Sequence, residues 1–401
     1  MERRVPETVT VFMKKHISKL GLVFLIGYAL VGALLLGYSY TQVDLGLTLT
    51  NASIARSIQT WFQHIGYFDR PLSTGIFISL MVVLFVLYGT IVKVIHDKKL
   101  TAKEVWICIG ALVVTTIFAY PAFSYDFFNY LFTAKTVLIY HKNPYLVTPL
   151  QFAGVDPWLS FMHWTHLASA YTPLWIIVTL VPFFLGFGYF LPLIWNLKIV
   201  IAAAYILAAI GIGKILEKED SERKLLGVAI FALNPLIIIE CLVSPHNDIL
   251  MMAMAIWAIV LYQNKKKWLS WLLLSGSVAM KLMTIFLIPA FFVGWKRRIT
   301  LSCIVIGFLV VLTQREALSW YWVWIVPFVA LVPDIGAFLV ISTGVSLGLL
   351  LQYAPFLYFG DWNNPVPTIK IWVLWVPIVI SIIIALVLEV KKKHILSKKT
   401  S

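Results

Sequence analysis

Two short polar segments interrupt an otherwise apolar chain, SYDFFNY at 124–130 and SPHND at 244–248. In the first segment, Asp126 stands between aromatic residues. An aromatic wall can partly desolvate a carboxylate and raise its pKa towards the range that a general base needs. A carboxylate in the first turn of a helix can instead complement the helix dipole and cap free N–H groups. The sequence alone leaves both interpretations of Asp126 open.

A helix over 125–140 would gather polar side chains on one face. Asp126, Asn129, Thr133 and Thr136 are spaced three and four residues apart, the spacing of neighbours on a helix surface. Phenylalanine and leucine cover most of the remaining surface. We therefore expect an interfacial helix that presents Asn129 beside Asp126.

The second segment places three ionisable residues, Glu240, His246 and Asp248, around one turn. Asn247 and Asp248 could simply begin a helix, with Asn247 as its cap. Glu240, however, falls at the end of an apolar run, where an ionisable group is costly unless it has a function. This grouping favours a binding site over a helix cap.

Basic residues near the same polar segments are candidate anion ligands. Arg315 follows an apolar run, and Lys135 lies within the expected interfacial helix. Such cations can bind a phosphate or extend to lipid headgroups, and for Lys135 the second role is the one we favour. Lys281 lies inside an apolar stretch and is therefore either a functional residue or a structural one that binds free helix carbonyls.

The composition indicates a membrane protein. The 401 residues are 61% hydrophobic and 12% charged, with a mean hydropathy of +0.90, whereas soluble domains have about 25% charged residues. The apolar runs are about 20 residues long, enough to cross the hydrocarbon of a bilayer as helices. The first run, 21–40, lacks a small-residue cleavage site and is interpreted as a retained span. The net charge of +14 comes mostly from short basic loops, so we expect no nucleic-acid partner.

The basic clusters orient the spans, because cytoplasmic loops are rich in Lys and Arg. These clusters lie at 3–19, 93–103, 214–224, 265–267, 296–298 and 391–399. Placing all of them inside predicts an all-α polytopic bundle of about ten transmembrane helices, a single domain over 1–401 with both ends in the cytoplasm. The expected spans are 20–40, 73–95, 104–121, 192–216, 225–243, 248–264, 299–314, 319–334, 336–356 and 369–390.

Two stretches do not fit as simple spans. The region 122–191 becomes a large extracytoplasmic loop, in which 172–187 forms a re-entrant or interfacial hairpin bounded by prolines. The segment 268–294 has basic clusters at both ends, so it is expected to enter and leave on the cytoplasmic side as two half-helices that meet near Lys281. With this topology the polar segments all face the extracytoplasmic side, and the cytoplasmic loops are short and lysine-rich.

The order of these motifs resembles the GT-C superfamily of glycosyltransferases, and most closely its polyprenyl-phosphate-mannose-dependent mannosyltransferases, both bacterial alpha-mannosyltransferases and the mannosyltransferase of GPI synthesis. The resemblance covers roughly residues 115–330. It rests on Asp126, Asn143-Pro144-Tyr145, Tyr171-Thr172-Pro173-Leu174, Asn234-Pro235, Glu240, His246-Asn247-Asp248, Lys281 and Pro289.

The resemblance implies transfer of a sugar, mannose by this likeness, from a polyprenyl-phosphate donor to an extracytoplasmic glycan or glycolipid acceptor. It assigns Asp126 as the base that deprotonates the acceptor hydroxyl for an inverting displacement. The leaving phosphate needs cationic partners, for which Arg315, His246 and Lys135 are the candidates, in that order.

The remaining motif residues are expected to bind substrate: Asn129, Asn143, Tyr145, Tyr171, Glu240, Asn247, Asp248 and Lys281. Many members of the superfamily have two adjacent acids in this loop, but Asp126 is flanked by Tyr125 and Phe127. We therefore predict neither a metal nor another cofactor, although Asp248 or Asp156 could supply a second acid through folding. The resemblance also implies a bacterial plasma membrane, with its lipids as partners.

Three other interpretations compete with this one. A transporter or flippase of lipid-linked sugars would show internal repeats and ionisable residues near the bilayer midplane; no clear repeat is present, and only Lys198 and Lys281 are expected to lie deep. A non-catalytic subunit of an envelope assembly would need no acid at Asp126. An envelope polymerase or ligase that uses another lipid-linked glycan is the third alternative.

Overall fold

The computed structural model describes residues 17–400, with side chains to residue 392, and all of its regular elements are helical. The longer helices are α1 (Lys19–Ser39), α3 (Arg70–His96), α4 (Ala102–Thr116), α7 (Phe190–Glu219), α10 (Asp248–Gln263), α11 (Lys267–Met280), α13 (Arg297–Leu312), α15 (Gly336–Leu351) and α17 (Val366–Thr400). The shorter ones are α2 (Ser53–Gln63), α5 (Asp126–Leu138), α6 (Pro173–Phe184), α8 (Lys224–Ala232), α9 (Pro235–Ile238), α12 (Ile288–Phe292), α14 (Val326–Ala330) and α16 (Tyr353–Phe359).

Short 3-10 or π-helical turns join several of these helices. They are η2 (Tyr40–Gln42), η3 (His64–Phe68), η4 (Pro149–Phe152), η5 (Pro157–Ser160), η6 (Ser221–Arg223), η7 (Ile239–Val243), η8 (Leu282–Leu287) and η9 (Ser319–Trp324). The expected all-α class is therefore confirmed for the described residues.

Five helices are long and apolar enough to cross a membrane, which agrees with a membrane protein. They are Lys19–Gln42, Arg70–His96, Phe190–Glu219, Gly336–Phe359 and Val366–Lys392. A sixth is reached if the bent pair Ser221–Ala232 and Pro235–Val243 forms one span. The other expected spans correspond to helices shorter than this length, so the number ten is not confirmed.

The bend of 54° in that pair has a local cause. Pro235 has no N–H to donate and disfavours the helical conformation of the residue before it. Asn234 accordingly has extended backbone, and its side-chain oxygen accepts the N–H of Leu236. The chain therefore begins a new, short helix at Pro235, which leads through η7 to the segment 244–248.

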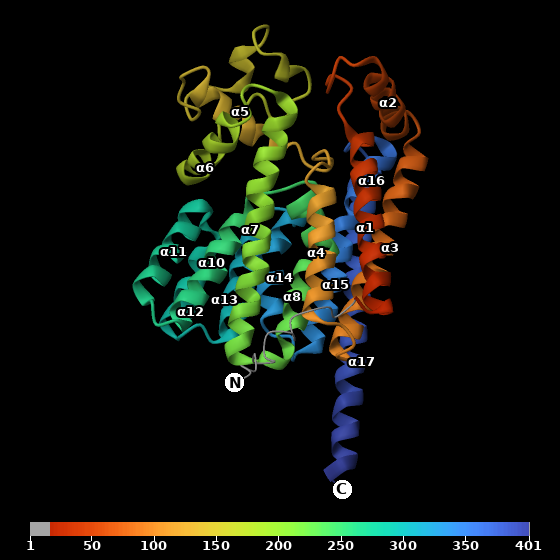
Figure 1. Ribbon diagram of the computed structural model, residues 1–401, viewed down its shortest axis with the longest axis vertical. Coiled ribbons are helices and arrows are strands. Elements are labelled where there is room, and N and C mark those ends of the chain that lie inside the picture. Colours follow the sequence, from red (N-terminus) through yellow and green to blue (C-terminus); the bar gives the residue numbers. More distant parts are fainter. Residues whose placement is uncertain (1–16, 401) are drawn as a thin grey trace, which may run out of the picture.

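The helices form an elongated bundle with long loops at one end (Figure 1). Helices α5 and α6 lie at that end, together with α2, and α17 projects from the opposite end. The basic cluster at 3–19 falls largely outside the described residues. The segment 122–191 contains α5, η4, η5 and α6 and holds the expected interfacial helix, which the structure bounds at 126–138.

Buried Lys198 on α7 connects two of the loops that carry polar motifs. Its Nζ donates hydrogen bonds to the carbonyl of Ala119, 2.6 Å away, and to that of Val243, 3.2 Å away. These carbonyls lie just after α4 and at the end of η7, where the chain leaves regular structure and has free acceptors. Lys198 therefore holds the entrances to the 122–130 and 244–248 segments at a fixed separation.

Helix α11 ends where the sequence predicted a break. Lys281 has an extended backbone conformation (φ −162°, ψ 130°), and η8 begins at the next residue. Thr172, the cap of α6, donates its hydroxyl to the carbonyl of Met280 at 3.0 Å. The end of α11 is thus tied to the start of α6, and Lys281 is presented at the same end of the bundle as α5.

Candidate active site

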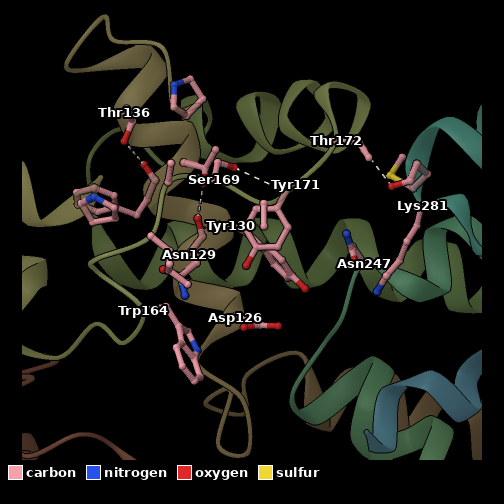
Figure 2. Close-up of a pocket in the computed structure, with 18 of the residues that line it drawn as sticks. Asp126, Asn129, Tyr130, Thr136, Trp164, Ser169, Tyr171, Thr172, Asn247 and Lys281 are labelled. Atoms are coloured by element: carbon pink, nitrogen blue, oxygen red, sulfur yellow. Dashed lines mark hydrogen bonds between the residues drawn. The ribbon is translucent and has the colours of Figure 1, made fainter. Parts of the chain in front are cut away.

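One cavity of about 390 Å³ lies between α5, the loop before α6, the start of α10 and the end of α11. We call it the site cavity. Figure 2 shows Asp126, Tyr171 and Asn247 around its interior, with Lys281 entering from another element. Its lining residues with hydroxyl, amide, carboxylate or cationic side chains are Asp126, Asn129, Tyr130, Thr133, Thr136, Ser169, Tyr171, Thr172, Asn247, Lys281, Arg315 and Tyr321.

Asp126 is the first residue of α5 and faces the site cavity together with the expected polar face of that helix. Among the described residues, none donates a hydrogen bond to the Asp126 carboxylate. In particular, the carboxylate does not cap the N–H groups in the first turn of α5. Burial raises the pKa of Asp126, while the nearby positive charges of His246 and Lys281 act in the opposite direction. The net pKa is raised, as a general base near neutral pH requires.

Lys281 forms an ion pair with Asp248 across the cavity wall. The distance from Lys281 Nζ to Asp248 Oδ1 is 2.7 Å, and the indole N–H of Trp324 donates to the same oxygen. The ammonium also lies over the rings of Tyr321 and Trp324, 5.7 and 5.5 Å from their centroids. These contacts hold the Lys281 charge at the wall, with about a third of its side chain still exposed.

A second buried pair lies behind an aromatic wall of the cavity. His246 Nδ1 is 3.2 Å from Glu240 Oε2, and the Tyr353 hydroxyl donates to Glu240 Oε1 at 2.9 Å. The imidazole stacks on the Trp320 ring, with centroids 4.4 Å apart, and Trp320 lines the cavity. Burial lowers the pKa of His246, but the hydrogen bond and charge of Glu240 outweigh it and raise the pKa overall.

Arg315 lines the cavity and is exposed. No ion pair with it is found in residues 17–392. The other cation of the lining, Lys281, is already paired with Asp248. The guanidinium therefore brings uncompensated positive charge to the mouth of the cavity, in a geometry suited to two oxygens of a phosphate.

Six residues expected to bind substrate do not line the cavity: Lys135, Asn143, Tyr145, Glu240, His246 and Asp248. Lys135 Nζ pairs instead with Asp156 Oδ2 at 2.6 Å and lies over the Trp158 ring, so its charge is compensated away from the cavity. Asp156 is likewise paired and does not line the cavity. Asn143 Oδ1 accepts the N–H of Tyr145 in a turn.

Tyr145 supports the cavity indirectly. Its hydroxyl donates to the carbonyl of Tyr171 at 2.7 Å, and Tyr171 lines the cavity. Glu240 and His246 also lie behind the lining, as described above, whereas Asn247 is part of it and makes no capping hydrogen bond with its side chain. Asn247 thus occupies the position before α10 that the cap interpretation expected, but its side chain makes no capping hydrogen bond.

The sequence missed several lining residues. Tyr130, Ser169 and Thr172 line the cavity, and Tyr353 binds Glu240 from a helix 113 residues away. Tyr130 lies four residues after Asp126 on α5, so the helical spacing was a usable signal for it. Nothing in the local sequence distinguishes Tyr353 from the other tyrosines of an apolar span.

The described residues contain no group of three or more His, Cys, Asp or Glu side chains arranged to hold a metal ion. What the cavity combines is a carboxylate of raised pKa, hydroxyl and amide groups suited to sugar hydroxyls, aromatic rings and cations at its rim. This set can activate a hydroxyl nucleophile, and its cations can stabilise a phosphate that departs with negative charge.

Comparison with curated proteins and with solved structures finds no match. A family model described as "Alpha-(1->6)-mannopyranosyltransferase, N-terminal domain" matches residues 25–297. This region contains the part of the cavity from Asp126 to Lys281, and only the wall formed by residues after 297 lies beyond it. Since the match covers more than half of the 401 residues, the chain belongs to the MptA_B family of mannosyltransferases and is a glycosyltransferase.

Proposed function

We propose that this protein transfers mannose from a polyprenyl-phosphate donor to a glycan or glycolipid acceptor on the extracytoplasmic side of a bacterial plasma membrane. The observation that carries the proposal is the site cavity, where the Asp126 carboxylate, with its raised pKa, and the uncompensated Arg315 guanidinium line one space. The family assignment supports the mannose. The same assignment does not favour the transporter or flippase interpretation.

In the proposed reaction Asp126 accepts the proton of an acceptor hydroxyl. The oxygen then attacks the anomeric carbon of mannose with inversion, and the bond from that carbon to the donor phosphate oxygen breaks. Polyprenyl phosphate departs with the bonding electron pair and therefore carries increased negative charge. Arg315 at the rim and Lys281 at the wall are placed to stabilise that charge.

The other lining groups fit the recognition of a sugar. Asn129, Asn247 and the hydroxyls of Tyr130 and Tyr171 can exchange hydrogen bonds with sugar hydroxyls. Trp320, held parallel to His246, offers an aromatic face on the cavity wall to the apolar face of a pyranose.

The membrane side of the proposal rests on charge and hydropathy. The basic clusters after α3, α7 and α10 lie towards the end of the bundle opposite to α5. Because cytoplasmic loops are rich in Lys and Arg, this arrangement supports an extracytoplasmic cavity. A donor whose lipid chain stays in the bilayer can then present its headgroup at the rim.

The test uses purified protein, polyprenyl-phosphate-mannose and a mannose-terminated acceptor, with mass spectrometry of both products. Asp126→Asn keeps the shape of the side chain but removes the base, and a positioned general base contributes about 10²–10⁴-fold to the rate. We expect turnover to fall by that factor while the thermal unfolding temperature stays unchanged. Asp361→Asn is the matched control, because Asp361 is an exposed carboxylate that does not line the cavity.

Normal turnover by the Asp126→Asn protein would refute the assignment of the base. The same assay with polyprenyl-phosphate-glucose and -arabinose tests the donor. If either is used better than the mannose compound, the proposed donor is wrong even though the base assignment stands.

A further inference from the structure

Helix α2 has the opposite polarity to that of an ordinary surface helix. Its buried residues are two glutamines, Gln59 and Gln63. Its large apolar side chains are exposed, with exposed fractions of 77% for Ile54, 51% for Ile58 and 61% for Trp61. Such a surface is unfavourable in water, because exposed apolar area is costly and buried amides need partners.

Hydrogen bonds fix this orientation. Gln59 Nε2 donates to the carbonyl of Leu47 at 2.6 Å, and its Oε1 accepts the N–H of Leu49 at 3.0 Å. Gln63 Nε2 donates to the carbonyl of Asp44 at 2.9 Å. Rotating α2 to bury its apolar face would leave these backbone groups without partners, so the exposed face is a built feature of the fold.

The exposed side chains form one continuous stripe. Ile54, Ile58 and Trp61 follow the i, i+4, i+7 spacing of one helix face. The stripe continues to Phe68, the last residue of η3, which is also exposed. Arg56 lies on the opposite side of the helix, the side of Gln59 and Gln63, but near the start of α2, where it is still exposed.

The position and charge of α2 identify what covers the stripe. The helix connects α1 and α3, which are both long and apolar enough to span a membrane, and η3 leads almost directly into α3. It lies at the end of the bundle that carries α5 (Figure 1). The sequence of α2 has no acidic residue to repel anionic headgroups, and Trp is enriched at membrane interfaces.

We propose that α2 is an interfacial anchor whose stripe of Ile54, Ile58 and Trp61 inserts into the lipid surface beside α1 and α3. Its partner is the bilayer itself, with Arg56 facing the headgroups or water.

The anchor is connected to the site. Gln63 of α2 binds the carbonyl of Asp44, and Asp44 Oδ2 accepts the hydroxyl of Tyr125 at 3.4 Å. Tyr125 immediately precedes Asp126 at the start of α5. Insertion of α2 therefore fixes the distance between the lipid surface and the first residues of α5. A lipid-linked substrate would enter the cavity at this level.

The test places a fluorescent label on each side of α2. Ile58→Cys and Arg56→Cys are made in a Cys303→Ala background, since Cys108 and Cys241 are buried. Each protein is labelled with bimane and reconstituted, one molecule per nanodisc, in phosphatidylcholine and phosphatidylglycerol with brominated acyl chains. We expect the label at position 58 to lose most of its fluorescence relative to unbrominated lipid, and the label at position 56 to lose little.

A second measurement does not depend on the dye. The unlabelled Ile58→Cys protein should react much more slowly with a water-soluble maleimide in nanodiscs than the Arg56→Cys protein does. Equal quenching at both positions, or none at position 58, would overturn the proposal. Protection of position 58 that arises only when two protein molecules share a nanodisc would assign the stripe to a second copy and also overturn it.

Discussion

Replacing Lys281 by methionine tests the ion pair at the cavity wall. Methionine keeps much of the aliphatic stem that lies against Tyr321 and Trp324 but removes the charge that compensates Asp248. The Asp248 side chain is only 1% exposed, whereas that of Lys281 is 32% exposed. Removing Lys281 should therefore destabilise the protein much more than removing the charge of Asp248.

Breaking a buried ion pair by removing one partner costs about 3–5 kcal/mol, because an uncompensated charge stays buried. Asp248 keeps the hydrogen bond from Trp324, so we expect the lower end of that range, about 3 kcal/mol, for Lys281→Met. Asp248→Asn leaves Lys281 at the cavity, where water can solvate it, and should cost only about 1 kcal/mol, the value of one ordinary hydrogen bond.

The assay is equilibrium unfolding in mixed micelles by titration with sodium dodecyl sulfate, followed by near-ultraviolet circular dichroism of the tryptophans. The double variant should be less destabilised than Lys281→Met alone, because no uncompensated carboxylate remains. The reasoning is refuted if Asp248→Asn is the more damaging single change, or if the two single effects simply add in the double variant.

Three further predictions concern the site and the packing. The rate should fall at acidic pH as Asp126 becomes protonated, and it should do so at a higher pH than for an ordinary aspartate because burial raises the pKa of Asp126. Lys281→Met removes a positive charge that lowers this pKa, so it should move the acidic limb of the kcat/KM profile to still higher pH. A shift of that limb to lower pH would contradict the assignment of Asp126 as the base. Arg315→Gln should raise the KM for the donor about tenfold to a hundredfold, which corresponds to the loss of a hydrogen bond to a charged group. The increase should be smaller for Arg315→Lys, which keeps the charge. An unchanged KM in the Arg315→Gln protein would argue against phosphate binding by Arg315. Gly348→Ala should destabilise by about 1–3 kcal/mol, because a Cβ there would lie 2.4 Å from the Leu374 carbonyl oxygen, while Gly110→Ala meets nothing within 4 Å and should be neutral or stabilising in the same titration.

Local patterns were sufficient for much of the fold. Apolar runs about as long as a bilayer is thick identified α1, α3, α7, α15 and α17 without any knowledge of packing. Helical spacing identified the polar face of α5, and the structure places that face in the cavity. Both results depend only on neighbours a few residues away, which sequence periodicity reports directly.

The same reasoning does not decide the number of spans or the partner of Lys135. Hydropathy does not reveal where a helix bends or stops early, so runs such as 319–334 were expected as single spans but are divided into η9 and α14. Lys135 looked available for a phosphate, but its partner Asp156 is 21 positions further along the chain in a loop that folds back. Only the path of that loop decides whether the charge is free.

The sequence by itself determined three features: the apolar character of the helices, the polar face that carries Asp126 and the break at Lys281. Each of these is encoded by side chains that are close together in the chain. Only the tertiary structure decided which charges compensate one another. Lys281 meets Asp248 across 33 residues and Tyr353 meets Glu240 across 113, and such pairings depend on how helices pack, which local sequence does not specify. The packing leaves Arg315 as the uncompensated cation of the cavity lining among the described residues.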